Sequence, residues 1–346
     1  MPTFATGTVE RVLDARDGLQ RLEVRVGDEI RTAVLYQRYA AGAAPGDRVV
    51  LNTTAVALGL GSGGDDFVVW NLEHETHEAP GGGHIMKLRY TPAQSDVLSV
   101  EAPESPHHAA MLDATDLGGM PVVATSLHSQ LLPVVVGSRL IRERLRIAYV
   151  MTDGGALEVP LSDTIARLRE RDWICGTISV GHAIGGDLEA VNLYSGLLAS
   201  REVLRADLAV VGMGPGVVGT ATPFGNTGVE LGLTVNAAAG LGGRPVACVR
   251  MSEGDPRHRH AGVSHHVMTA LRRVAVAAAD VAVPAGWAAA VAALADRHRI
   301  VEVDASAVLD VVRAEPGASH MGRGPAEDPL FFEAAGAAGM HAASLV

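Results

Sequence analysis

The sequence predicts an α/β protein in which a doubly wound, mostly parallel sheet follows a small N-terminal all-β domain. Three observations support this fold class. Short β-branched or alternating segments, separated by turn sequences, fill the first 80 residues. From residue 121 onward, near-continuous apolar segments alternate with segments of helical periodicity. Glycine accounts for 40 residues and aromatic residues for only 4%, which favours close packing of helices on a sheet.

Five short strands are expected in the N-terminal domain, residues 1–80. They are Thr8–Leu13, Leu19–Val26, Ile30–Tyr36, Asp47–Leu51 and Phe67–Trp70. Strands of this length and spacing are typical of an OB or SH3-like barrel. The loop Gly59–Gly64 could hold a ligand, but nothing in this domain carries recognisable chemistry. Residues 81–120, with one expected strand at Ile85–Tyr90, are predicted to connect this domain to the next.

Residues 121–346 predict the doubly wound, Rossmann-like α/β domain. Strands are expected at 121–125, 146–151, 173–180, 206–212, 245–251, 280–284 and 299–303, and helices at 128–144, 160–171, 187–203, 226–241, 262–277, 286–297 and 305–314. Continuous apolar strands indicate burial on both faces, and helices between them indicate parallel crossovers. In such a sheet, ligands bind beyond the carboxyl ends of the strands, at a topological switch point.

The composition excludes several classes of partner. The net charge of −11, with an isoelectric point near 5.7, disfavours general binding to nucleic acids or anionic membranes. The longest apolar stretch, Val281–Ala295, contains proline and glycine and is shorter than the ~20 residues of a membrane span. Cys175 and Cys248 lie in apolar strand-like segments, which predicts a reducing, cytoplasmic location without disulfides. A homo-oligomer is expected because most soluble oligomers are symmetric assemblies of one chain.

Glycine and polar residues gather after four consecutive predicted strands, most densely at residues 212–228. Gly214-x-Gly216-x-x-Gly219 formally matches a dinucleotide-binding motif, but Pro223 interrupts the expected helix and no acidic residue follows about 20 positions later. We therefore predict a backbone nest for an anion. Its candidate ligand-binding residues are Gly212, Gly214, Gly216, Gly219, Thr220, Thr222, Asn226 and Thr227. The alternative is a tight loop whose glycines serve only turning and packing.

The segment 250–266 is rich in arginine and histidine. Arg250 and Arg257 offer fork-shaped donors that suit a carboxylate or phosphate. His258 and His260 are two residues apart, so an extended chain would point both to one side. With Asp255, or with His265 or His266, they could complete a divalent metal site, although no known ligand spacing is matched. A solvated or helix-capping loop, and anion or acid–base chemistry without metal, are the alternatives.

Two further strand ends carry candidate catalytic residues. His182 follows a strand and could exchange protons near neutral pH, whereas Asp187 is expected to cap the next helix. Asp153 could position a substrate or bind a metal, or it could simply form an Asp-Gly turn. Ser126, His128 and Ser129 follow the first strand expected in this domain and provide residue types of a Ser/His/Asp hydrolase, but no Gly-x-Ser-x-Gly motif supports one.

Four stretches resemble one known family: NTTAVALGLGSGGDDFVV, GTISVGHAIGGDLEAVN, GMGPGVVGTATPFGNTG and RMSEGDPRHRHAGVSHH. They are similar to the bacterial family called domain of unknown function 3866, and the resemblance extends over essentially the whole chain. It implies a bacterial origin, and it implies no activity or cofactor.

We expect an enzyme that acts on a small anionic metabolite. The 212–228 loop, Arg250 and Arg257 would hold the anion, and His182 with His258 or His260 would transfer protons; the cofactor is unknown and a divalent metal is optional. The alternative is a non-catalytic ligand sensor whose β domain contacts a partner. A scaffold protein would need an exposed apolar face, which the alanine-rich helix predicted at 329–343 could supply.

Overall fold

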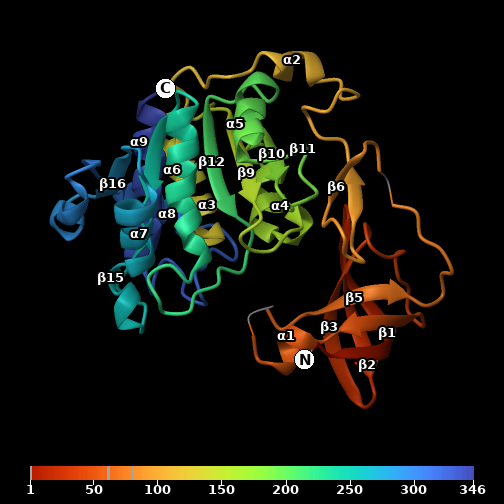
Figure 1. Cartoon of the computed structure of the whole chain (residues 1–346). Helices are drawn as coiled ribbons and strands as arrows, with labels where there is room; N and C mark the ends of the chain where they lie inside the picture. The colour runs from red at the N-terminus through yellow and green to blue at the C-terminus, as the bar shows by residue number, and fades with distance from the viewer. Residues whose placement is uncertain (1, 61–62, 80) are drawn as a thin grey trace. The chain divides into compact units, whose positions relative to one another are not determined.

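The computed structural model describes residues 2–60, 63–79 and 81–346 (Figure 1). The chain divides into two compact units, Met1–Leu98 and Ser99–Val346. The predicted connecting segment is thus divided, with residues 81–98 in the first unit and 99–120 in the second. Gly61 and Ser62 of the predicted Gly59–Gly64 loop, and Pro80 at the predicted domain boundary, lie outside the described residues.

The first unit contains the predicted small barrel. Its strands are β1 (Phe4–Arg16), β2 (Leu19–Val26), β3 (Glu29–Tyr36), β4 (Arg48–Asn52) and β5 (Asp66–Asn71). Within the described residues they close in the order β1-β2-β3-β5-β4, with β3 and β5 parallel, which corresponds to the OB alternative. The short helix α1 (Thr54–Ala57) and the hairpin β6 (Ile85–Lys87)–β7 (Ser95–Val97) complete the unit. The predicted strand at 85–90 ends early because Leu88 and Tyr90 have positive φ angles.

The second unit is built on the predicted doubly wound sheet. Its strands are β8 (Pro121–Ala124), β9 (Ile147–Thr152), β10 (Gly176–Val180), β11 (Leu188–Ala190), β12 (Leu208–Met213), β13 (Arg244–Cys248), β16 (Asp280–Pro284) and β17 (Arg299–Val303). In the described part of the chain they form an eight-stranded parallel sheet in the order β11-β10-β9-β12-β8-β13-β16-β17. The central strands are buried along their whole length, as their continuous apolar sequences predict.

Helices cover both faces of this sheet (Figure 1). One face packs against α3 (Leu131–Ile141), α4 (Asp163–Glu170), α8 (Ser306–Arg313) and α9 (Pro329–Ser344). The other packs against α5 (Leu193–Glu202), α6 (Glu230–Gly240) and α7 (His265–Thr269), with α2 (His108–Leu112) beside α5. The short 3₁₀ turns are η1 (His128–Gln130), η2 (Val159–Leu161), η3 (Thr227–Val229), η4 (His258–His260) and η6 (Ala288–Leu294). The segment η5 (Ala270–Val274) is a π turn. Outside the main sheet, β14 (Met251–Ser252) pairs with β15 (Gly262–Val263).

The helix predicted at 187–203 begins later, because β11 precedes it. Asn192 caps α5, accepting hydrogen bonds from the backbone N–H groups of Tyr194 and Ser195 at 2.9 and 3.1 Å. Asp187, the expected cap, instead accepts hydrogen bonds from the backbone N–H and hydroxyl of Thr177. The expected N-cap role of Asp187 is therefore wrong.

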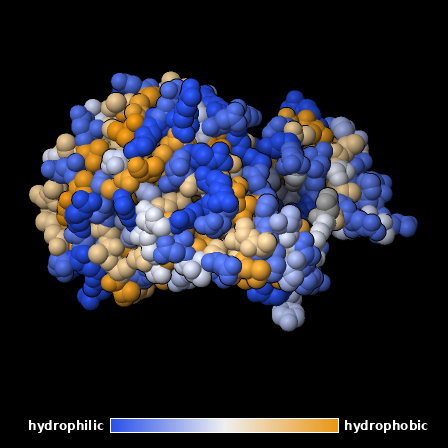
Figure 2. All heavy atoms as spheres, turned by 90° about the horizontal axis from the view of Figure 1, so that it is seen from above, coloured by the Kyte–Doolittle hydropathy of each residue, from blue (hydrophilic) through white to orange (hydrophobic). Residues whose placement is uncertain are grey.

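The expectation of an exposed apolar face on the helix at 329–343 is also wrong. Most of α9 is buried, because it packs against α3 and across the sheet. On the face drawn in Figure 2, hydrophobic residues lie interspersed among hydrophilic ones. Among the residues that the structure describes, no helix combines the length and apolar character needed to cross a membrane.

The sheet order creates a topological switch point around β8. The chain leaves β8 towards α3 on one face, whereas it leaves β12 and β13 towards α6 and α7 on the other. Adjacent strand ends whose loops diverge in this way are where α/β proteins bind ligands. The ends of β8, β12 and β13 are therefore the place to look for a functional site.

Candidate functional site

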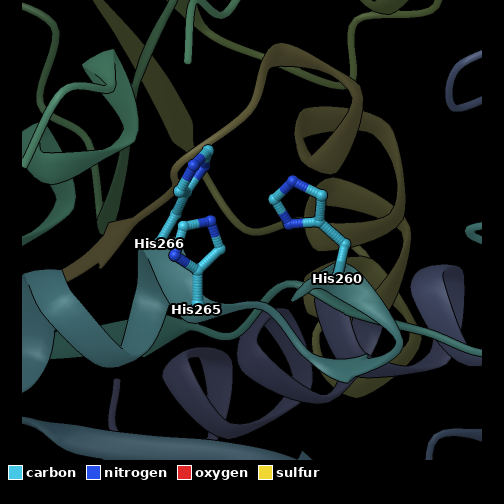
Figure 3. A group of neighbouring side chains, drawn as sticks. All are labelled: His260, His265 and His266. Atoms are coloured by element: carbon cyan, nitrogen blue, oxygen red, sulfur yellow. The ribbon is translucent and has the colours of Figure 1, made fainter. Parts of the chain in front are cut away.

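Three histidines come together after β13 (Figure 3). We call His260, His265 and His266 the three-histidine cluster. The ring centroids are 5.3 Å apart for His260 and His265, 4.8 Å for His260 and His266, and 4.3 Å for His265 and His266. One ring nitrogen of each lies within 4.8 Å of the other two. Figure 3 shows His265 and His266 at the start of α7, facing His260 on the preceding turn.

The local backbone determines which histidines meet. Residues 258–260 form a 3₁₀ turn and not the extended chain we expected, so His258 is exposed while His260 is buried. The pairing of His258 with His260 is therefore wrong. Ser264 holds the cluster together: its hydroxyl bonds the His260 Nδ1 at 2.8 Å, and its N–H donates to the Arg250 carbonyl at 3.0 Å.

The glycine-rich loop after β12 packs against this cluster. A Cβ atom at Gly219 would lie 2.9 Å from Cε1 and 3.3 Å from Nε2 of His266, so glycine makes room for the ring. Asn226 is buried, and its Oδ1 has no hydrogen-bond partner among the described residues. Gly228 lies against Ser126, the residue that follows β8 by two positions. The ends of β8, β12 and β13 thus meet here.

The loop does not present its polar groups as a nest in this conformation. Thr220 and Thr222 bond to each other and to the backbone of Gly225. The hydroxyl of Thr227 accepts from the Val218 N–H and donates to a methionine sulfur. Other glycines of the motif serve packing: a Cβ at Gly212 would overlap the Thr125 hydroxyl, one at Gly214 would overlap the Ala156 carbonyl, and Gly216 has φ near +101°. Anion contact by this loop stays a prediction.

Arg250 and Arg257 are already paired with a carboxylate. Asp255 accepts hydrogen bonds from Arg250 at 2.8 Å and from two nitrogens of Arg257 at 2.9 and 2.8 Å. Arg323 lies 3.5 Å from Asp255 and 3.3 Å from Asp328. We call these five residues the arginine–carboxylate cluster. Because Asp255 is fully committed to arginine, it is not available as the metal ligand that the sequence suggested.

Burial and positive charge set the protonation states here. Burial, with Arg250 and Arg257 nearby, lowers the pKa of His260 to about 3. Burial, His265 and Arg250 lower the pKa of His266 to about 4, and burial also lowers that of His265. Burial lowers the pKa of Arg250 to about 10, against the opposing effect of Asp255. At neutral pH the imidazoles are therefore uncharged and the guanidinium is charged.

His320 and Arg323 also belong to this region, and the sequence did not single out either of them. His320 is buried, stacks on Phe331 at 4.0 Å, and bonds Ser129 through Nδ1 at 3.0 Å. Burial, Arg250 and Arg323 lower its pKa to about 3. His320 and Arg323 lie more than 50 residues beyond the histidine-rich segment, in a stretch without periodic pattern, so no local signal marks them.

His182 does not join the three-histidine cluster. It follows β10, and β9, β12 and β8 separate β10 from β13. Four strand spacings of ~4.8 Å amount to roughly 19 Å, which is far beyond hydrogen-bond reach. The backbone N–H of His182 donates to Asp153 at 2.9 Å, so Asp153 orders the turn after β10. Proton transfer shared between His182 and His260 is therefore not supported.

A separate cavity of about 260 Å³ lies beside Asp153. Its polar lining is Thr152, Asp153, Asn192, Glu230 and Thr234, and the rest is largely apolar. Thr152 donates a hydrogen bond to Glu230 at 2.5 Å, and burial raises the pKa of Glu230. The cavity sits at the ends of β9 and β10, on the side of β12 away from β13.

His128 has a structural role. Its Nε2 accepts from the hydroxyl of Ser162 at 2.6 Å, while Nδ1 faces the Tyr149 hydroxyl and the Met213 carbonyl at 3.2 and 3.3 Å. Ser162 also caps α4 by accepting from Ile165 N–H at 3.0 Å. Because no carboxylate contacts His128 in the described residues, the arrangement lacks the third member of a Ser/His/Asp triad.

The two cysteines are unpaired. Cys248 is buried in β13, and Cys175 lies just before β10 and is half-buried. Burial raises the pKa of both thiols, which keeps them protonated and unreactive.

Comparisons with known proteins identify the family of this chain but no individual relative. Searches of curated proteins and of solved structures found no match. A family model matches residues 32–339, and these contain both the glycine-rich loop after β12 and the three-histidine cluster. The resemblance noted from the sequence is thereby confirmed. The chain belongs to the family described as "Protein of unknown function (DUF3866)".

Proposed function

We propose that the chain is an enzyme acting on a small anionic metabolite, bound where β8, β12 and β13 end. The excess positive charge of the arginine–carboxylate cluster carries this proposal. Within the cluster three guanidinium groups face two carboxylates, a surplus of one positive charge (3 − 2 = +1). Arg250, Asp255 and Asp328 are almost completely buried. The guanidinium of Arg257 is the most exposed of the three, at 35%, so an anionic ligand arriving from solvent can reach the surplus charge and act as its counterion.

Unused hydrogen-bond donors in the same cluster support the proposal. Arg250 Nε is buried and has no hydrogen-bond partner among the described residues, and Arg323 Nη2, which also makes no hydrogen bond, has an ion pair with Asp255 at 3.5 Å. Like Arg250 Nε, His320 Nε2 is buried without such a partner, and this ring is close enough to Arg250 and Arg323 for both to lower its pKa. Guanidinium forks match the oxygen spacing of carboxylates and phosphates. A ligand with several oxygens would satisfy these donors.

The location of the arginine–carboxylate cluster favours catalysis over non-catalytic binding of an anion. The cluster adjoins the three-histidine cluster through Arg250, at the switch point where α/β enzymes bind substrates. Fixed positive groups in a water-poor site stabilise negative charge that develops on a substrate. The site therefore fits a reaction in which negative charge builds up on the substrate as it reaches the transition state. That charge would develop on the substrate group that faces Arg250.

A ligand screen tests the anion site. The full chain, without an affinity tag, is unfolded thermally in the presence of inorganic phosphate, nucleoside phosphates and small carboxylates. A ligand at ~100 times its Kd should add about 2.7 kcal/mol to the free energy of unfolding. Arg323→Lys keeps the charge but loses the fork, so we expect the Kd to rise about tenfold or more. Arg313→Lys, on the exposed side of α8, is the matched control and should leave the Kd unchanged.

Turnover then separates the two functional hypotheses. Ligands that bind are assayed for conversion, which should be lost in Arg323→Lys and retained in Arg313→Lys. Binding without conversion would favour the non-catalytic sensor. If no anion binds, or if both variants bind as the unaltered chain does, the anion site is wrong.

The proposal includes the cellular location and the oligomeric state of the protein. The unpaired thiols of Cys175 and Cys248 support a cytoplasmic location. A homo-oligomer remains our expectation, and light scattering of the purified chain would measure its mass in solution.

A further inference from the structure

Three imidazole nitrogens in the three-histidine cluster are placed like the ligands of a metal ion. One nitrogen from each ring lies within 4.8 Å of the others. Ligand nitrogens in a tetrahedral site, at 2.0–2.1 Å from the metal, are roughly 3.3 Å apart. Closing the cluster around an ion therefore requires each ring to move by about 1 Å.

Buried ring nitrogens without partners point to a missing ligand. His265 Nε2 and His266 Nε2 are both buried, and neither has a hydrogen-bond partner among the described residues. His266 itself is more than nine-tenths buried. Buried polar atoms in native structures are normally hydrogen-bonded or coordinated, so two orphaned nitrogens side by side need an explanation. A metal ion between the rings explains both at once (Figure 3).

The surroundings of His260 match the second shell of a metal site. Metal-bound histidines usually donate their other ring N–H to a neighbouring oxygen, which fixes the ring and its tautomer. The Ser264 hydroxyl lies 2.8 Å from His260 Nδ1 and can accept that hydrogen bond. This arrangement leaves Nε2 of His260 with its lone pair available. The hydroxyl precedes α7 yet makes no capping hydrogen bond to it.

We infer that His260, His265 and His266 bind a divalent transition-metal ion of the Zn²⁺ class. Three nitrogen ligands favour zinc, iron, cobalt, nickel or copper over magnesium and calcium, which prefer oxygen. Three protein ligands also leave a position open, as in catalytic rather than structural zinc sites. The inference deepens the proposed function, since the open position would face the substrate that Arg250 helps to bind.

The neighbouring charges determine what fills the open position. Arg250, Arg257 and Arg259 all lie close enough to the three-histidine cluster to act on it electrostatically. The same positive charges repel a bare divalent cation. They therefore favour an ion whose fourth ligand is anionic, either hydroxide or an oxygen of the anionic substrate.

Metal binding is measured on the tag-free full chain, in buffer without phosphate or carboxylate. We expect about one Co²⁺ per chain, with the intense visible absorption of a tetrahedral complex, and displacement of Co²⁺ by Zn²⁺. His265→Ala is the main variant because His265 is only half-buried. Its affinity should fall at least about 100-fold. His258→Ala is the matched control, since this exposed histidine lies two residues from His260 and should not matter.

A second variant keeps all three ligands. Gly219→Ala would place a methyl group 2.9 Å from the His266 ring, so we expect weaker metal binding with an altered Co²⁺ spectrum. Loss of affinity in His258→Ala equal to that in His265→Ala would overturn the inference, as would the absence of Co²⁺ binding by the folded chain. Because anion binding is assayed separately through Arg323→Lys, failure of the metal site and failure of the anion site can be told apart.

Discussion

Three histidines, His128, His260 and His320, each make a hydrogen bond to one serine hydroxyl. Ser264 bonds His260 next to the three-histidine cluster, and Ser129 bonds His320 beside the arginine–carboxylate cluster. Ser162 has two partners at once, because it caps α4 and also donates to His128. In each pair the serine fixes the position of a neutral imidazole that burial has made hard to protonate.

Ser162→Ala should destabilise the protein more than the loss of an ordinary helix cap. The cap is worth about 1 kcal/mol, and leaving the His128 Nε2 without a donor adds about 1–3 kcal/mol. We expect the free energy of unfolding, measured with urea, to fall by about 2–4 kcal/mol. Asn192→Ala removes a cap that makes no histidine contact and should cost only about 1 kcal/mol. Equal losses in the two variants would show that the bond to His128 contributes nothing.

Residue-scale predictions from sequence succeeded where the pattern was local. The segment 250–266 stood out, and His265 and His266 were among its possible ligands. The choice of His258 failed because a 3₁₀ turn rotates successive residues by about 120°, so residues two apart point in different directions. Contacts such as that of Ser129 with His320 join distant parts of the chain, and no local pattern encodes them.

At the scale of elements, glycines allow α9 to lie directly against α3. A Cβ at Gly137 of α3 would overlap the carbonyl of Gly336, and one at Gly339 would overlap the carbonyl of Val134. The helices can therefore approach until their backbones touch. This contact fixes α3, which follows the Ser126–Gln130 segment of the candidate site.

Gly339→Ala should be strongly destabilising, because a methyl group has no space between these helices. Overpacking of this kind costs about 1–3 kcal/mol. Gly240→Ala in α6 is the control: nothing lies within 4 Å of the added methyl group, and alanine is the better helix former by ~1 kcal/mol. Thermal unfolding should therefore show a lower Tm for Gly339→Ala and an equal or higher one for Gly240→Ala. A lower Tm for both would mean that helix propensity and space do not decide the outcome.

The elements that the sequence predicted well were those with a clear apolar pattern, including the five-residue strands β16 and β17. Periodicity located α4, α6 and α8 to within a few residues, because each presents an apolar stripe to the sheet. β11 was missed, because three residues are too few to establish a pattern, and the predicted helix absorbed it. The error mattered for the site, since it assigned a capping role to Asp187.

At the scale of the whole molecule, the order of the strands decides which candidate residues can cooperate. Alternating strands and helices predicted a parallel sheet, but the order arises from packing between distant segments. That order brings β8 and β12 next to each other and β13 beside β8. It also separates His182 and Asp153 from Arg250, so that residues expected in one site occupy two different strand ends.

The stability of the whole chain should fall as the pH drops below about 6.5. Burial lowers the pKa of His128 to about 4 and that of His320 to about 3, from an ordinary value of 6.5. Between these values the unfolded chain binds protons that the native chain does not, so acid favours unfolding. We expect a loss on the order of 1–2 kcal/mol per histidine between pH 6.5 and 5. Half-buried Glu230, whose pKa is raised, opposes part of this loss.

Urea titrations at pH 7.5, 6.0 and 5.0 would measure this dependence. His128→Gln should have a shallower pH dependence than the unaltered chain, whereas His258→Gln, which replaces an exposed histidine, should follow it closely. A free energy of unfolding that stays constant from pH 7.5 to 5.0 would contradict the assignment of neutral buried imidazoles.

The burial of α9 also affects how the protein is made. Every strand of the sheet leaves the ribosome before α9 does, yet α9 covers β13, β16 and part of β8. Until it emerges, the nascent chain carries an open apolar face and α3 lacks its neighbour. The α/β unit therefore reaches its native packing only after α9 has left the ribosome, and interrupted chains that lack α9 should be substrates for chaperones and proteases.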